Sequence, residues 1–545
     1  MVVEYLHSVN FAKRTGKNAI IMSMRKKLIL SALLLLSASG PFQTLWNAEG
    51  QGSGQAGVFA QVVNSGETIV SGTVGPRILS MEDVISLAQE KSISAMSNRN
   101  AFAASYWSYR SFRAQYLPSL NLSAGLLNFN RSLVTLQDFQ TGAIRYAGNY
   151  NLSNDMTLSI RQNIAATGGT LSLSTSMSRL DQYSPQRLIT WYAQPVYLTY
   201  MQNLWGYNSL KWDKKIEPHN YEIAKRQYLE NMEQVTISAA ECFWNLNAVR
   251  VSYNNARQSY EESKRLYEAA QKRFGMGTIT RDNLLQLELK MLNDSLAIQT
   301  QAVSLRSAQN QLCSYIGYQE DTELTLTINY SVPDITLIYD EVLDKAMENS
   351  SFNLSQLVSR LEAERSIAQA KANRGISASV NARFGMSNDA DKFNESLKGL
   401  KDQEVVGLTF NVPIVDWGLG EGRVKMAKAQ AETNKNRLDQ ALIDYRQDIF
   451  VRVMEFNNQR SQCEISRRAM QIAEETYRLA LQNFGSGTMS VTDLNQLQTS
   501  RDNARSTYEN SIRSYWNQYF NLRRITLYDF ISGTDISAEF DRIVK

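Results

Sequence analysis

The chain contains the same glycine turn twice, with matching residues around both copies. The first copy is Phe274-Gly275-Met276-Gly277-Thr278, and the second, 210 positions later, is Phe484-Gly485-Ser486-Gly487-Thr488. The match extends past the glycines, because Tyr267 corresponds to Tyr477 and Leu284 to Leu494 at the same offset. One unit of the chain has therefore been duplicated.

Large or apolar residues recur every seven positions before each turn. They are Met232, Ala239, Leu246, Tyr253, Tyr260, Tyr267 and Phe274 in the first copy, and Leu442, Ile449, Phe456, Cys463, Met470, Tyr477 and Phe484 in the second. After the second turn the stripe continues through Leu494, with one polar interruption at Arg501. This period is typical of helices that supercoil around neighbours. Each turn is predicted to be the tip of a helical hairpin, where glycine takes the positive φ that ends a helix.

Two very long helices are predicted, over about 214–274 and 421–482. Each has roughly 60 residues and would be about 90 Å long. Further helices are predicted at about 81–115, 282–316, 340–373 and 492–524. Helices of this length are far longer than those of ordinary globular proteins. They are expected to span a long distance or to wrap around another structure.

Apolar and small polar residues alternate between the helices, which predicts β-strands. The segments are 120–124, 156–164, 171–177, 196–200, 376–383 and 406–412. Alternation of this kind suits a transmembrane β-barrel, with one face toward lipid and the other toward a wet lumen. Aromatic residues near the strand ends would form an interfacial girdle: Trp191, Tyr192, Tyr200, Trp205, Tyr207 and Trp417. A soluble antiparallel sheet packed on the helices has the same period and is the alternative.

The first strand region is about 50 residues longer than the second, between roughly 130 and 180. We interpret this excess as an added hairpin that turns at Gly168-Gly169. Without this excess, the strand regions of the two repeats match each other and together supply four strands. Four strands are too few to close a barrel of useful bore. The two long helices of a single chain also cannot bury all of their apolar stripes against each other. We therefore expect several copies of the chain to share one barrel.

The N-terminal region reads as a targeting segment. Met24-Arg25-Lys26-Lys27 is basic and 28–36 is apolar, so 24–60 is predicted to be a signal peptide, with 1–23 as an upstream extension. Residues 61–78 form a flexible leader rich in Gly, Ser and Gln. The first repeat then covers 79–335, the second 336–530, and a C-terminal tail 531–545.

Composition gives no indication of catalysis or of nucleic-acid binding. The net charge of +4 comes from 57 basic and 53 acidic residues, and the histidines are His7 and His219 alone. We predict no enzyme activity, no metal site and no cofactor. The cysteines, Cys242, Cys313 and Cys463, are expected as buried or half-buried residues of helices. Charged runs such as Glu261-Glu262 with Lys264-Arg265 are expected on solvated helix surfaces.

This duplicated plan resembles the TolC family of outer-membrane efflux proteins. The resemblance rests on the order of helix, strands, long helix, tip and helix, and on Val412-Pro413-Ile414-Val415-Asp416-Trp417-Gly418 leading into a long helix. It covers about 79–530. It implies a mainly α fold with a transmembrane β-barrel: a homotrimer whose three chains share a 12-stranded barrel and extend a helical α-barrel into the periplasm. The implied function is an exit duct in the outer membrane, in contact with its lipid and docked through a periplasmic adaptor (membrane fusion) protein to an inner-membrane pump.

The resemblance also implies roles for residues at the tips. The segments Gly275-Met276-Gly277-Thr278 and Gly485-Ser486-Gly487-Thr488 match the family's adaptor-contacting hairpin ends. Two acidic residues after the second tip form entrance rings in the family; here Asp493 matches the first and Gln496 stands at the second. In the first repeat Asn283 and its neighbour Asp282 hold the corresponding place. The alternative for Asp493 is a carboxylate that favours the helix N-terminus.

A secreted coiled-coil structural or adhesive protein with a small β-domain is the main rival. A stand-alone porin would need more strands per chain than the sequence offers. The kind of pump, whether for efflux or type I secretion, and the substrate are left open.

Overall fold

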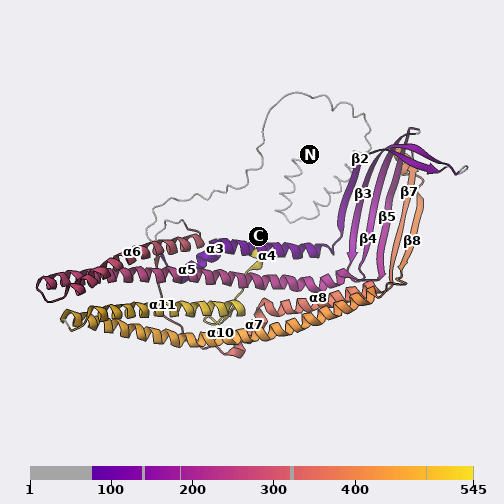
Figure 1. Ribbon diagram of the computed structural model, residues 1–545. Coiled ribbons are helices and arrows are strands. Elements are labelled where there is room, and N and C mark those ends of the chain that lie inside the picture. Colours follow the sequence, from indigo (N-terminus) through magenta and orange to yellow (C-terminus); the bar gives the residue numbers. More distant parts are fainter. Residues whose placement is uncertain (1–76, 138–141, 185, 319–323, 487, 544–545) are drawn as a thin grey trace, which may run out of the picture.

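The computed structural model describes residues 77–137, 142–184, 186–318, 324–486 and 488–543. The predicted upstream extension, the signal peptide, Gly487 and nearly all of the leader lie outside these residues. Across the described residues, the molecule is a long bundle of helices with a sheet at one end (Figure 1). Among the helices described, none combines the length and apolar character needed to cross a membrane.

The first repeat runs along the bundle, into the sheet and back. Its helices and strands are β1 (Arg77–Leu79), α3 (Met81–Lys91), α4 (Ile93–Ala114), β2 (Ser119–Gln137), β3 (Ile144–Ile164), β4 (Gly169–Ser184), β5 (Leu188–Trp205), α5 (Ser209–Gly275) and α6 (Arg281–Tyr315). Strand β1 pairs in parallel with β6 (Leu324–Leu326), which lies near the end of the first repeat.

The second repeat follows the same course with fewer strands. It consists of α7 (Tyr339–Asn349), α8 (Ser351–Arg374), β7 (Ser377–Ala390), the short α9 (Phe393–Ser396), β8 (Lys401–Asn411), α10 (Leu419–Ser486) and α11 (Val491–Thr526). The second repeat ends with β9 (Tyr528–Asp529), and the tail then forms β10 (Thr534–Asp535) and α12 (Phe540–Ile543).

The two long helices are confirmed, at 67 residues for α5 and 68 for α10. The prediction of a single first helix in each repeat is wrong, because Ser92 separates α3 from α4 and Ser350 separates α7 from α8. Both serines have an extended backbone, and the Ser92 hydroxyl accepts a hydrogen bond from the Ala95 N–H. A serine that caps the next helix, as Ser92 does, competes with the continuous helical ladder, whereas the Ser350 hydroxyl donates back to the Ala346 carbonyl of the preceding helix.

The seven-residue stripes face the inside of the bundle. Ile449, Phe456, Cys463 and Tyr477 of α10 are buried, as are Ala239 and Leu246 of α5. Helix α5 packs against both α6 and α11, and α11 packs against α10, so the four helices lie in the order α6-α5-α11-α10. The cysteines occupy helices as predicted: Cys313 and Cys463 are buried and Cys242 is half-buried.

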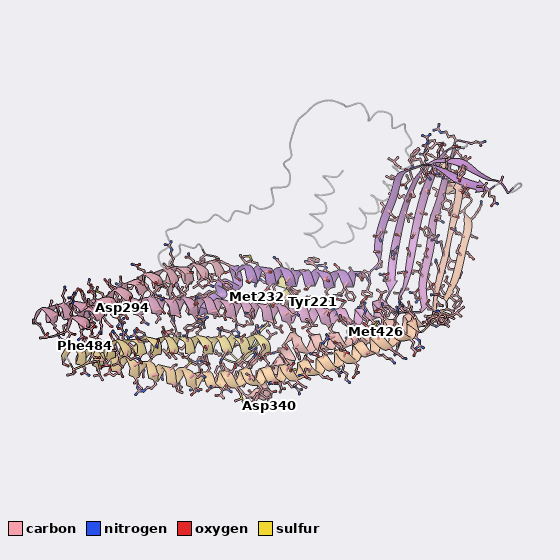
Figure 2. The ribbon with its side chains drawn as sticks, in the orientation of Figure 1. Tyr221, Met232, Asp294, Asp340, Met426 and Phe484 are labelled. Carbon is pink, nitrogen blue, oxygen red and sulfur yellow. The ribbon has the colours of Figure 1, made fainter. Side chains whose placement is uncertain are left out.

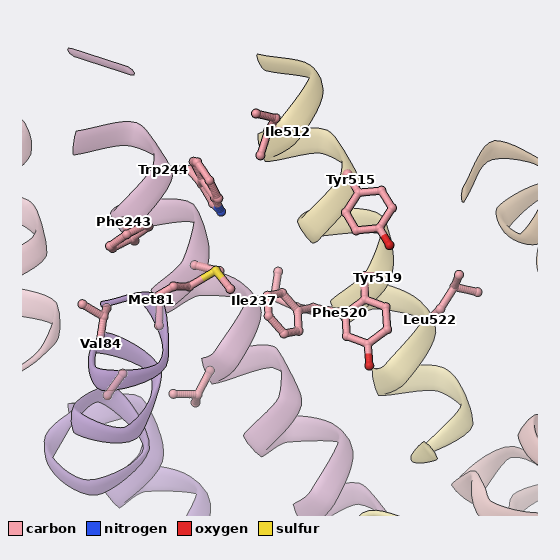
Figure 3. Packing of buried hydrophobic residues seen from close by; sticks show 14 of the residues in the cluster. Met81, Val84, Ile237, Phe243, Trp244, Ile512, Tyr515, Tyr519, Phe520 and Leu522 are labelled. Atoms are coloured by element: carbon pink, nitrogen blue, oxygen red, sulfur yellow. The ribbon is translucent and has the colours of Figure 1, made fainter. Parts of the chain in front are cut away.

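The main core lies where the two repeats meet (Figure 3). Met81 and Val84 of α3 pack against Phe243 of α5, and Tyr515 and Tyr519 of α11 complete the cluster. Each fully buried side chain of this size contributes about 1.5–3 kcal/mol from burial. The core therefore fixes α11 against α5 and joins the two halves of the chain.

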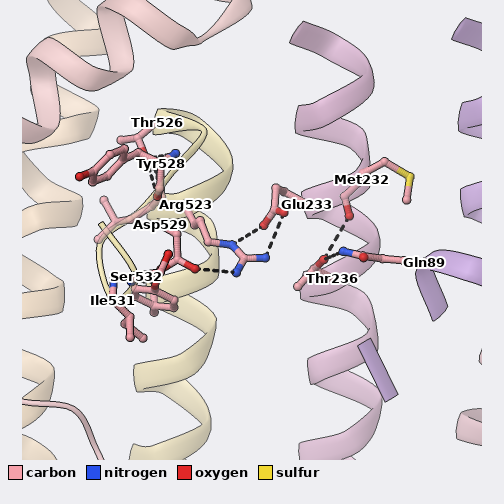
Figure 4. Close-up of polar contacts among 12 residues, drawn as sticks. Gln89, Met232, Glu233, Thr236, Arg523, Thr526, Tyr528, Asp529, Ile531 and Ser532 are labelled. Carbon is pink, nitrogen blue, oxygen red and sulfur yellow. Dashed lines mark hydrogen bonds and ion pairs between the residues drawn. The ribbon is translucent and has the colours of Figure 1, made fainter. Parts of the chain in front are cut away.

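A buried ion pair crosses the same boundary (Figure 4). Arg523 of α11 donates to both carboxylate oxygens of Glu233 on α5, at 2.7 and 3.0 Å. Arg523 also lies 3.5 Å from Asp529, which accepts a hydrogen bond from the Tyr519 hydroxyl. Burial raises the pKa of Glu233 above its ordinary value, against the opposing effect of Arg523. The pair adds a polar connection to the apolar contact between the repeats.

The six long strands form one antiparallel sheet in the order β2-β3-β4-β5-β7-β8. The two repeats join where β5 pairs with β7, for example at Leu198 opposite Phe384. The predicted added hairpin is confirmed: β3 turns into β4 beside Gly168, whose φ is +77°. The chain thus contributes six strands to the sheet, two more than the matching regions alone predict.

Candidate functional site at the hairpin tips

The first tip is a tight turn between α5 and α6. The Met276 N–H donates to the carbonyls of Lys272 and Arg273, each at 3.2 Å, and the Thr278 N–H donates to Arg273 at 3.0 Å. The Thr278 hydroxyl donates to the same carbonyl at 2.9 Å. Gly277 has a φ of +71°, which a side chain would disfavour. These bonds satisfy the last carbonyls of α5, and the turn stands at the end of the bundle as predicted.

The second tip, between α10 and α11, uses the same contacts. Thr488 donates from its N–H and its hydroxyl to the Asn483 carbonyl, at 3.0 and 3.1 Å. The Ser486 and Thr488 hydroxyls lie 3.1 Å apart. A bond between the tips brings them together, because the Arg273 guanidinium donates to the Gly485 carbonyl at 2.6 Å.

A cavity of about 680 Å³ lies between the two tips. Leu266, Ala270 and Met276 line it from the first hairpin, and Phe484 and Val491 from the second. Figure 2 places Phe484 at this end of the bundle. The Met276 side chain is 70% exposed beside it. Arg273, Thr278 and Ser486 also line it, so the end of the bundle presents a hollow of mixed apolar and polar lining between two hydroxyl-rich turns.

A buried polar cluster links three of the long helices a few turns behind the tips. Arg501 of α11 is 2% exposed. Its guanidinium lies 4.2 Å from the ring centre of Tyr477 on α10 and 3.5 Å from the carboxylate of Glu262 on α5. The Tyr477 hydroxyl donates to the same carboxylate at 2.8 Å, and Asp502 lies 2.9 Å from Arg501. Burial and the adjacent Glu262 raise the pKa of the Tyr477 hydroxyl.

This cluster corrects one expectation and explains another. Glu262, expected on a solvated surface, has a side chain only 19% exposed and contacts Arg501. Arg501 is the polar interruption of the seven-residue stripe. The sequence showed where the stripe is interrupted, but it did not indicate that Glu262 is the partner of Arg501. The two residues are 239 positions apart, so only the packing of α11 on α5 brings them together.

The predicted entrance residues lie just behind the tips and are exposed or half-exposed. The Asp493 N–H donates to the Ser490 hydroxyl at 3.1 Å, and that hydroxyl donates to the Asp493 carboxylate at 2.7 Å. In the first hairpin the Asn283 N–H donates to the Thr280 hydroxyl, and Asp282 accepts a hydrogen bond from Gln286. Within one chain Ser490 thus caps α11 and Asp493 lies in the first turn of that helix, which is where the alternative interpretation places it. A ring of Asp493 and Gln496 depends on other copies and stays a prediction.

The sheet at the opposite end has one apolar and one polar face. Five residues lie directly opposite one another across successive strands and are 36% to 51% exposed: Leu120, Ile160, Leu173, Leu198 and Phe384. The next row, on the other face, includes Ser172, Thr199 and Arg383. An exposed apolar face on this scale marks a surface that another apolar phase or molecule covers.

The aromatic residues predicted at the strand ends divide into two groups. Trp205 and Trp417 lie where the sheet meets the helices and are 56% and 96% exposed. Trp191, in contrast, is buried and packs edge-on against Phe393 of α9. Trp205 and Trp417 are therefore exposed enough to lie at a membrane interface, whereas Trp191 is not.

Comparison with known proteins finds a family match over most of the second repeat. Residues 345–526, from α7 through α11, match the family model of the outer membrane efflux protein. This segment is therefore similar to outer membrane efflux protein domains. The resemblance to the TolC family is thereby confirmed.

The fold of most of the chain is similar to that of solved outer membrane proteins. The Campylobacter jejuni CmeC outer membrane channel superposes with a TM-score of 0.60 at 15% identity, over 85% of this chain and 88% of that one. The Vibrio cholerae outer membrane protein VceC gives 0.56 at 14%, over 84% and 97%. The open state of the Neisseria gonorrhoeae MtrE outer membrane channel gives 0.56 at 13%, over 84% and 89%. A comparison with curated proteins gives no match.

Proposed function

We propose that the protein is the outer-membrane exit duct of a tripartite efflux or type I secretion system. Three copies close a duct that takes substrates from an inner-membrane pump and a periplasmic adaptor protein and releases them outside the cell. The observation that carries this proposal is a two-faced sheet joined end to end with two helical hairpins. In the described part of the chain, the lateral strands β2 and β8 and the lateral helices α6 and α10 each have one side without a partner.

Exposed apolar stripes on the two lateral helices support assembly from several copies. On α6 the stripe is Leu285, Leu289, Leu292, Leu296 and Val303, which are 52% to 72% exposed. On α10 it is Val451, Met454, Ile465, Ile472 and Leu479, which are 43% to 66% exposed. Both follow the spacing of a coiled-coil seam. Packing α6 of one copy against α10 of the next would cover both stripes, and such a head-to-tail contact closes into a ring.

The apolar face of the sheet suits contact with outer-membrane lipid. The strands have 11 to 21 residues, and about 9–11 are enough to cross a bilayer. Small polar residues on the other face would then line a wet lumen. CmeC and MtrE, which share this fold, are described as outer membrane channels. With the sheet in the membrane, the bundle of helices extends into the periplasm.

The hairpin tips are the proposed contact with the adaptor. They present the hydroxyls of Thr278 and Ser486 in the lining of a hollow that also has apolar side chains, with the Thr488 hydroxyl beside Ser486, and this offers both hydrogen bonds and buried area to a partner protein. In a ring of three copies the Asp493 carboxylates would lie near one axis. These carboxylates would repel one another, and their combined negative charge would attract cations to the entrance.

A secreted coiled-coil structural or adhesive protein remains the second candidate, because exposed seams also serve filament formation. It accounts for the stripes on α6 and α10. It gives no account of an apolar sheet face over Leu120, Leu173 and Leu198, and it predicts neither membrane insertion nor conductance.

The deciding experiment measures the oligomeric mass of the detergent-purified protein and its single-channel conductance in planar bilayers. We expect a trimer with a small, mostly closed conductance. Leu292→Glu places a charge in the α6 seam and should give monomers, whereas Asn293→Glu, an exposed neighbour with the same added charge, should stay trimeric. A wild-type chain that is monomeric or never inserts would refute the duct and leave the coiled-coil protein.

A further inference from the structure

The added hairpin β3–β4 is an integral part of the sheet. Strand β3 has 21 residues and β4 has 16, and they pair with each other and with β2 and β5 along most of their length. Removing them would leave the four strands that the matching regions predict. The hairpin therefore changes the number of strands that one chain brings to the sheet.

The hairpin carries the two-faced pattern of the other strands. Ile160, Leu171 and Leu173 are 36% to 44% exposed on the apolar face, while Ser172 is half-buried and Ser174 is 7% exposed on the polar face. A segment folded inside a wet lumen would meet water or polar groups on both faces and would not need this alternation. The pattern favours a place in the wall between lipid and lumen.

The turn of the hairpin is fixed where the sheet meets the helices. The Asn208 side chain, which caps α5, donates to the Ala165 carbonyl at 3.1 Å, and the Gln202 side chain donates to the Thr167 carbonyl at 2.8 Å. Gly168 fits against Asn208 so closely that an added Cβ would lie 2.9 Å from it. The hairpin thus spans the full height of the sheet, starting from the helix end.

We propose that β3 and β4 belong to the membrane wall, so that three copies close a barrel of 18 strands in place of the 12 implied by the family. This inference rests on the proposed trimeric duct. Each chain adds six strands of alternating direction, so β2 leaves the helices and β8 returns to them. The free side of β8 can therefore pair antiparallel with β2 of the next copy, which removes both open edges.

The added strands widen the duct in the membrane. Barrel width grows about linearly with strand number, so 18 strands give a wall about half as wide again as 12. With strands about 4.8 Å apart and tilted by about 40°, the backbone diameter is roughly 36 Å rather than roughly 24 Å. The membrane end is then wider than the family plan requires, and its added lining consists of small side chains such as Ser172 and Ser174.

The experiment is cryo-electron microscopy of the full-length protein in lipid nanodiscs, counting strands in the barrel cross-section. Eighteen strands are expected. A matched variant lacking residues 144–184 joins β2 to β5 at the far end of the sheet and should close a barrel about two-thirds as wide. A trimer with 12 wall strands and the hairpin inside the lumen would overturn this inference alone. Absence of a trimer would overturn the proposed function as well.

Spin labels on adjacent hairpin residues give a second readout if the deletion variant does not fold. A label at Leu173→Cys should collide with oxygen dissolved in lipid, and one at Ser172→Cys with a water-soluble nickel chelate. These two positions face opposite sides of the sheet. Water access at both positions would place the hairpin in the lumen and refute its membership in the wall.

Discussion

Replacing Glu262 by Gln is expected to loosen the two hairpins from each other behind their tips. The change keeps the shape of the side chain and an acceptor for the Tyr477 hydroxyl but removes the charge beside Arg501. The Arg501 side chain is 3% exposed, and leaving such a cation without its partner costs about 3–5 kcal/mol. Asp502 remains 2.9 Å away, so we expect a smaller loss of about 1–3 kcal/mol.

Hydrogen exchange of the purified wild-type and variant proteins measures this loss locally. Amides of α10 and α11 around the cluster should exchange about 5- to 150-fold faster in the Glu262→Gln variant. Glu261→Gln is the matched control. Glu261 forms an exposed ion pair with Arg257, and exposed ion pairs contribute little to stability. Arg501→Met should also cost about 1–3 kcal/mol, because it leaves the Glu262 and Asp502 carboxylates without their buried cation.

The double variant decides whether the charges act as a pair. Glu262→Gln added to Arg501→Met should cost almost nothing further, which gives a coupling of at least about 1 kcal/mol. If the two effects simply add, the reasoning that Arg501 depends on Glu262 is wrong.

Three further predictions concern single residues. Burial raises the pKa of Glu509 in the folded protein, despite hydrogen bonds from Tyr330 and Asn247 that oppose the rise. The contribution of the protonated Glu509 to stability is therefore complete below the unfolded pKa of about 4.3, and it is lost as the pH rises through the folded pKa. The melting temperature of Glu509→Gln relative to wild type should therefore rise between pH 4 and pH 8, and a constant difference would contradict this. Gly277→Ala should destabilise the first tip by about 1 kcal/mol, because Gly277 has a positive φ, and the loss should appear as faster hydrogen exchange at this tip. Gly275→Ala is the control, because Gly275 has no positive φ and an added Cβ there meets open space. Multivalent cations should block conductance of the wild type but not of Asp493→Asn; block that persists would remove Asp493 as the ring.

Much of the fold followed from local periodicity. The seven-residue stripes located α5, α6, α10 and α11, and the two-residue alternation located all six strands of the sheet, because both patterns repeat within a few residues. The breaks at Ser92 and Ser350 were missed, since serine is tolerated inside helices and ends one only when its backbone turns extended. At the tips, the glycines and threonines were found from the repeat, but the bond from Arg273 to Gly485 was not.

The sequence by itself determined that the chain is a duplicated rod and sheet, because helix and strand periods and glycine turns are set by neighbouring residues. Tertiary structure alone decided which elements meet: β5 with β7, α11 with α5, and Arg501 with Glu262. These contacts join residues far apart along the chain, and their free energy depends on burial that exists only after the repeats pack. For the same reason the sequence suggested an added hairpin, whereas only the assembled sheet gave it a place between β2 and β5.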